Sequence, residues 1–179
     1  MKKSLFAMAA ILGLALTSCS SDDNNKKNEN TSTFVLKVDD LQGNINDGTV
    51  TLDPTQTYTL TGGLVVKGGA TLIIPAGTTI KASATADPTS LFIAVERNAK
   101  INVNGTAAKP VIMTSAKAVP TEGSWGGLII AGNAKVNTGD NGTSEVGSLS
   151  YGGTNNTDSS GNINFLKISY TGSKFSTTK

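Results

Sequence analysis

The chain has 179 residues, with 15 Lys and Arg against 13 Asp and Glu, no His and a single Cys. The absence of His excludes Ser-His-Asp and Cys-His triads and removes the commonest zinc ligand. The nearly balanced charge predicts no basic surface for nucleic acid, and a lone Cys cannot form an internal disulfide, so the fold must be held together by packing.

The first 18 residues have the parts of a bacterial lipoprotein signal peptide. Lys2 and Lys3 form a basic start, and residues 5–16 form an apolar core that is too short to cross a bilayer as a helix. Small residues then lead to Cys19. We expect cleavage before Cys19 and acylation of its thiol, which would anchor the protein in a membrane. The alternative is an ordinary secretory signal with an incidental Cys.

Residues 19–33 predict the lipidated Cys and a flexible, disordered tether. From residue 20 to residue 33 no side chain is apolar, so burial cannot offset the entropy lost on ordering. Asp22 and Asp23 resemble the acidic export signal that follows the acylated Cys in Bacteroidetes-type surface lipoproteins. We therefore expect a lipid-anchored protein of the outer membrane that faces the cell exterior, with a periplasmic location as the alternative.

From residue 34 onward, short apolar runs rich in β-branched residues are bounded by Gly, Asn or Pro. No stretch keeps the 3.6-residue period of a substantial helix, so the chain is expected to be all-β. Short strands alone would allow a sandwich or a barrel. We expect strands at residues 34–38, 49–52, 58–60, 64–66, 71–74, 79–81, 91–95, 100–103, 111–114, 128–130, 135–137, 149–151 and 165–170.

An internal repeat favours a solenoid. Residues 66–74, 95–103 and 130–137 align without gaps, each with a strand, a short corner, an Ala and an alternating strand. The aligned Ala residues are 99 − 70 = 29 and 134 − 99 = 35 positions apart, within the range of solenoid repeats.

The fold that we predict is a right-handed parallel β-helix. An N-terminal cap is expected at residues 34–60 and coils at residues 61–179, with the last coil incomplete. The extra residues of the longer repeats are polar, and they predict loops at residues 83–90, 116–124 and 138–147.

Gly69, Asn98 and Asn133 occupy the same corner position of the repeat. Gly and Asn adopt positive φ most readily, so we expect a left-handed backbone at each corner. Stacked corners would place the side-chain amides of Asn98 and Asn133 next to each other, in a ladder.

Alternate strand residues should point into the solenoid and form aliphatic columns. The expected inward residues are Leu72, Ile74, Ile101, Val103, Ile129 and Val136. Open solenoid ends expose unpaired strand edges. The cap would cover the first end, and for the other end we expect either a truncated gene product or a partner that covers the open C-terminal coil.

Four runs of sequence resemble the opening of Bacteroidetes-type β-helix surface lipoproteins: residues 58–66, 69–81, 110–115 and 123–130. The similarity covers about residues 41–172. It implies the β-helix fold and the surface location, and it brings no catalytic residues with it. Members of that family are usually longer, which supports truncation here.

Possible ligand contacts are the aromatic side chains of Trp125, Tyr151 and Tyr170, which could stack on a sugar ring. Trp125 could instead clamp a loop onto the wall of the helix. Arg97 beside Glu96 could supply the base of a polysaccharide lyase, although a solvated pair at the corner is the expected outcome.

Asp140, Glu145 and Asp158 are the loop carboxylates that could serve a glycosidase, and residues 140–145 could offer calcium ligands, although a polar turn is expected. We predict no catalytic residue, no cofactor and no metal site. The predicted function is a non-enzymatic surface scaffold that binds a glycan, matrix or protein ligand. The alternative is a polysaccharide-active β-helix enzyme whose catalytic coils are missing or unrecognised.

Overall fold

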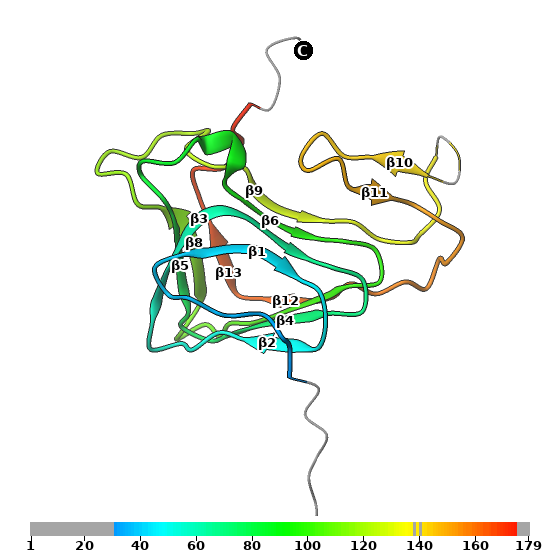
Figure 1. The fold of residues 1–179 in the computed structure, drawn as a ribbon, viewed down its shortest axis with the longest axis horizontal. Helices are drawn as coiled ribbons and strands as arrows, with labels where there is room; N and C mark the ends of the chain where they lie inside the picture. Colours follow the sequence, from blue (N-terminus) through cyan, green and yellow to red (C-terminus); the bar gives the residue numbers. More distant parts are fainter. Residues whose placement is uncertain (1–30, 138, 140, 175–179) are drawn as a thin grey trace, which may run out of the picture.

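The structure is a computed structural model that describes residues 31–137, 139 and 141–174. The predicted signal peptide, Cys19, most of the tether and Asp140 lie outside the described residues. Within them, short strands follow one another around a common axis, joined by corners and loops (Figure 1). The elements are β1 (Leu41–Ile45), β2 (Thr49–Thr51), β3 (Thr57–Val66), β4 (Thr71–Pro75), β5 (Thr79–Ala82), the 3-10 turn η1 (Pro88–Ser90), β6 (Phe92–Val95), β7 (Lys100–Asn104), β8 (Val111–Ser115), β9 (Gly127–Ile130), β10 (Gly142–Thr143), β11 (Ser150–Tyr151), β12 (Gly161–Asn164) and β13 (Leu166–Ile168).

The strands stack in parallel from coil to coil. One sheet has the order β12-β7-β4-β2. In the other, the first half of β3 pairs with β5, which is followed by β8 and β13, and its second half pairs with β1 and with β6, which is followed by β9. The interior strands of each stack therefore hydrogen-bond to the coils above and below them, about 4.8 Å away, whereas the outermost strands pair on one side. This arrangement confirms the predicted parallel β-helix and excludes a sandwich.

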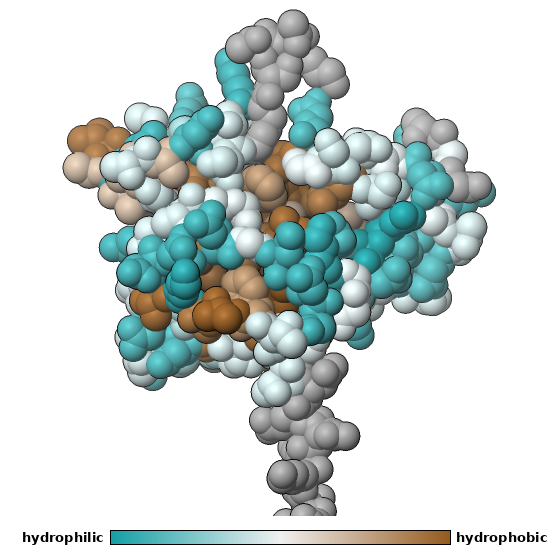
Figure 2. Space-filling view, viewed as in Figure 1, coloured by the Kyte–Doolittle hydropathy of each residue, from teal (hydrophilic) through white to brown (hydrophobic). Residues whose placement is uncertain are grey.

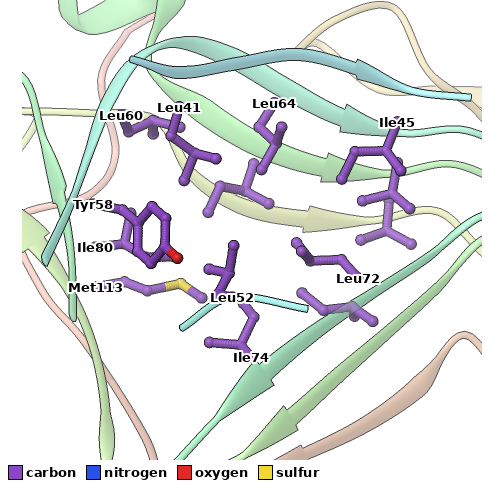
Figure 3. Close-up of a cluster of buried hydrophobic side chains, with 14 of the residues drawn as sticks. Leu41, Ile45, Leu52, Tyr58, Leu60, Leu64, Leu72, Ile74, Ile80 and Met113 are labelled. Carbon is purple, nitrogen blue, oxygen red and sulfur yellow. The ribbon is translucent and has the colours of Figure 1, made fainter. Parts of the chain in front are cut away.

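The core consists mainly of aliphatic side chains that point between the sheets, and Tyr58 and Met113 lie among them (Figure 3). Leu72, Ile74, Ile101 and Val103 are buried, as their alternating pattern predicted. The register places Leu72 against Ile101 and Ile74 against Val103, so that the columns run along the axis. Each column buries apolar surface, and this burial stabilises a fold that has no internal disulfide.

The stretch expected as a cap, residues 34–60, divides into two parts. β1, β2 and the first half of β3 already belong to the stacked sheets. Ahead of them, Phe34 and Leu36 pack against the core, while Val35 is exposed. No strand forms at residues 34–38. The carbonyl of Val38 accepts the backbone N–H of Thr59 in β3 at 2.8 Å, but the segment forms no continuous ladder with β3 and instead lays its apolar side chains over the core.

The strand predicted at residues 135–137 is wrong. The third repeat follows the other two as far as Asn133, and the chain then leaves the wall until Gly161, where β12 takes the position beside β7. Val136, which was expected to point inward, instead makes an isolated antiparallel bridge with Gly139. We call residues 134–160 the insertion.

The inward face of β9 also differs from the prediction. Leu128 is in register with Ile93, and Ile130 is in register with Val95, so these two residues continue the inward columns. Ile129 lies on the outer face, where it packs against a second small cluster of Ala94, Ala131 and Leu149. The insertion contributes Leu149 and so covers this part of the outer wall.

The last coil leaves its inward side chains partly open. Ile130, Ile163 and Ile168 are 40%, 45% and 41% exposed, although their register partners in the preceding coil are fully buried. Within the described part of the chain, no further strand pairs with the outer edge of β9, β12 or β13.

Candidate ligand-binding corner

The insertion projects beyond the coils as a small hairpin (Figure 1). Its strands β10 and β11 pair antiparallel, with Gly142 opposite Tyr151. Ser144 closes the turn, because its hydroxyl donates to the carbonyl of Val146 and accepts from the N–H of Leu149. The projecting lobe is mostly hydrophilic (Figure 2). The insertion is thus a hydrogen-bonded unit with a polar surface.

An amide ladder fastens the base of the insertion to the corner of the preceding coil. The carboxylate of Asp158 accepts the backbone N–H of Asn133 at 2.8 Å, and this bond is the main reason why the pKa of Asp158 is lowered. The Asn133 side chain in turn donates to Oδ1 of Asn98 at 2.8 Å, which confirms the predicted contact between the two amides.

The predicted corner conformation is confirmed at two of its three positions. Gly69 and Asn98 have φ angles of 91° and 66°. Asn133 does not share their positive φ. The physical reason is that the chain does not turn here into another wall strand but departs into the insertion.

Arg97 and Glu96 do not pair with each other. Arg97 donates from Nη1 to Oδ1 of Asn141 at 2.9 Å and to the carbonyl of Gly152 at 3.0 Å, so it holds both sides of the hairpin. Glu96 forms its ion pair with Lys67 of the neighbouring coil, with 2.6 Å between Nζ and Oε1. The predicted solvated pair is therefore replaced by two separate structural contacts.

A cavity of about 340 Å³ lies where the hairpin meets this corner. We call it the corner cavity. Its size is at the lower end of the range for small-molecule sites. The lining residues are Gly68, Glu96, Arg97, Asn98, Gly147, Ser148, Leu149 and Ser150.

A sequence profile of the pectate-lyase-like β-helix domain matches residues 43–179. The chain belongs to this family. The match starts within β1 and so includes the stacked coils, the corner and the insertion. No curated protein and no solved structure matches the chain.

Family membership confirms the β-helix part of the resemblance noted from sequence, whereas the lipoprotein part stays a prediction. No helix in the described ranges is long and apolar enough to span a membrane.

The predicted aromatic contacts of this pectate-lyase-like β-helix have different environments. Trp125 is only 1% exposed, and its indole N–H donates to the carbonyl of Ser169 at 2.8 Å. Its ring lies inside the core and cannot stack on a ligand, which corrects its assignment as a possible contact. Trp125 instead clamps the loop before β9 onto the wall.

Tyr151 and Tyr170 are 38% and 41% exposed, so both remain candidate contacts. Tyr151 belongs to the hairpin and lines a second cavity of about 230 Å³. Its ring lies over Gly142, where a side chain would overlap it. Tyr170 lies in the corner after β13, where its carbonyl accepts the backbone N–H of Trp125.

The carboxylates of the β-helix are distributed over separate turns. Asp53 and Asp87 each accept the backbone N–H two residues ahead, and these bonds lower the pKa of both carboxyl groups. Glu145 lies in the hairpin and Asp158 at its base. In the part of the chain that the structure describes, no group of three or more His, Cys, Asp or Glu side chains could hold a metal ion.

Lys67, Ser148 and Ser150 take part in the corner but were not predicted. Lys67 and Glu96 follow the aligned residues Val66 and Val95 directly. Opposite charges at one repeat position were thus a usable signal for a stacked ion pair. The two Ser residues carried no such signal, because they lie in the insertion, outside the repeat.

Proposed function

We propose that this protein is a lipid-anchored scaffold of the outer membrane that binds a ligand at its corner cavity without transforming it. The observation that supports this most directly is the corner cavity itself, formed between the corner of a coil and a polar hairpin. Arg97 holds the hairpin in place with two hydrogen bonds, so the lip of the cavity is ordered before any ligand arrives.

The carboxylates favour binding over hydrolysis. A general acid of a glycosidase needs a raised pKa. The pKa of Asp158 is instead lowered, chiefly because its carboxylate accepts the backbone N–H of Asn133. Glu96 is held in an ion pair with Lys67. The competing function is a polysaccharide-active enzyme, which membership of a pectate-lyase-like family favours.

Turnover is the test that separates the two functions. The protein is incubated with neutral and acidic polysaccharides, and new reducing ends and unsaturated sugar products are measured alongside binding. Binding without product formation supports the scaffold. Sustained product formation at a rate proportional to the concentration of the protein would refute the scaffold function.

Location is tested separately through Cys19. The Cys19→Ala variant cannot be acylated and is expected to leave the membrane fraction. A Ser18→Ala variant keeps a small residue before the cleavage point and should stay in the membrane. Retention of Cys19→Ala in the membrane fraction would contradict the lipid anchor.

A further inference from the structure

We infer that the corner cavity takes an uncharged sugar, held through two neighbouring hydroxyl groups by Glu96 and Arg97. The inference rests on the proposed binding function and specifies the ligand class for the same cavity. Three properties of the cavity support it: the charges of its lining residues, the hydrogen-bonding atoms that these residues have available, and the polar side chains at its lip.

The charges that line the cavity disfavour an ionic ligand. Glu96 and Arg97 are adjacent residues, and both line the corner cavity. Each of these two charges attracts the ion that the other repels, so the attraction of either kind of ion to the cavity is largely cancelled. A neutral ligand is not subject to this repulsion.

The two side chains offer complementary hydrogen-bonding atoms. Within the described structure, Glu96 uses Oε1 for its bond with Lys67, and Arg97 uses Nη1 for both of its bonds. Oε2 of Glu96 is therefore an available acceptor, and Nε and Nη2 of Arg97 are available donors. A carboxylate only accepts and a guanidinium only donates, whereas a hydroxyl does both. Adjacent hydroxyls of a sugar can satisfy the two together, through charge-assisted bonds.

The lip adds hydroxyls and offers little apolar surface. Ser148 and Ser150 line it, and Ser148 has a positive φ of 50°. The apolar side chain among the lining residues is that of Leu149, which is 6% exposed and packed into the second core cluster. A peptide ligand would need apolar pockets for its side chains, so the lining favours a sugar over a peptide.

The experiment is a calorimetric titration of the intact protein with soluble neutral oligosaccharides and with uronic acid oligosaccharides of equal length. The variants are Glu96→Gln, which removes the charged acceptor, and Ser148→Gly, which removes a hydroxyl and tolerates positive φ. Lys67→Gln breaks the ion pair between Lys67 and Glu96, as Glu96→Gln does, but keeps the carboxylate of Glu96. Glu122→Gln, at an exposed position in the loop before β9, is the matched control.

We expect the neutral oligosaccharides to bind and Glu96→Gln to weaken binding about fivefold to tenfold, because the amide oxygen of Gln still accepts but lacks the charge that strengthens the bond. Ser148→Gly should weaken it about threefold to tenfold. Lys67→Gln should retain most of the affinity, and Glu122→Gln all of it.

Other results overturn the inference in distinguishable ways. Neutral sugar binding that survives both Glu96→Gln and Ser148→Gly would place the ligand elsewhere and leave the scaffold function intact. Equal losses in Lys67→Gln and Glu96→Gln would show that the ion pair matters only for structure. Tighter binding of the uronic acid oligosaccharides than of the neutral ones would refute the uncharged sugar. Cleavage of the sugars would refute the scaffold and keep the site.

Discussion

Two isoleucines in one inward column provide a matched test of the stacked architecture. Ile74 is in register with Val103, which is in register with Ile163. Ile74 is fully buried, whereas Ile163 is 45% exposed in the last coil. The same substitution, Ile→Ala, therefore has two different expected effects on the free energy of unfolding.

The magnitudes follow from the exposure of each side chain. Replacing Ile by Ala removes three carbon atoms, a transfer term of about 2.4 kcal/mol at about 0.8 kcal/mol for each. At Ile74 the surrounding coils close over a cavity, so the total should reach about 3–4 kcal/mol. At Ile163 just over half of the transfer term applies and no closed cavity forms, which gives about 1.3 kcal/mol.

Urea unfolding followed by the fluorescence of Trp125 measures both values. The single Trp of the chain is buried, so its emission should report loss of the core. The slope with denaturant should be the same in both variants, because the folded stack is kept. Equal destabilisation by the two substitutions, or a larger effect at Ile163, would refute the inward columns and the open last coil.

Three further predictions concern single contacts. Trp125→Phe removes the hydrogen bond to Ser169, so it should lower stability by about 1–3 kcal/mol in thermal unfolding followed by circular dichroism; a lower affinity without lower stability would contradict the buried clamp. Asn98→Ala should lower stability by about 1–2 kcal/mol more than Asn98→Gly, because of these two replacements Gly adopts a φ of 66° without strain and Ala does not; equal stabilities would refute a left-handed corner. The lowered pKa of Asp158 stabilises the fold above the ordinary Asp pKa of about 3.9, and this contribution is lost as the pH falls through the lower folded pKa. The protection of the Asn133 amide, measured as its exchange rate relative to the intrinsic rate at the same pH, should therefore stay constant from neutral pH to about pH 5 and fall in stronger acid. Asp158→Asn should lack this acid step, and a loss of protection that begins near neutral pH would contradict the assignment.

Strands with one buried face could be predicted well from sequence. β7 alternates polar and apolar residues, which places Ile101 inward, and β4 aligns with β7 in the repeat, so the inward position of Leu72 followed from the same pattern. β9 gave no such alternation, because its outer face is also covered. Ile129 packs against the second core cluster there, and a run that is apolar on both faces does not reveal which residues point inward.

The insertion marks the limit of what the repeat could predict. β12 carries Asn162-Ile163-Asn164, which matches Asn102-Val103-Asn104 of β7, so its pairing with β7 could have been predicted from sequence. Residues 134–137 also match the repeat and come earlier in the chain, so the strand was assigned there instead.

The corner cavity depends on contacts that no local pattern encodes. Arg97 reaches Asn141 and Gly152 across long stretches of sequence. The neighbouring ion pair of Lys67 with Glu96 could have been predicted from the repeat, whereas this brace could not.

The return of the chain to the wall at Gly161 has an evolutionary consequence. β12 pairs in register with β7 after the insertion, so the length of the insertion does not affect how the coils stack. Doubling the length of a flexible excursion raises its closure free energy by only about 0.6 kcal/mol. This position can therefore accept segments of different length and chemistry, so related proteins could diversify their specificity here, and grafted recognition sequences should be tolerated here as well.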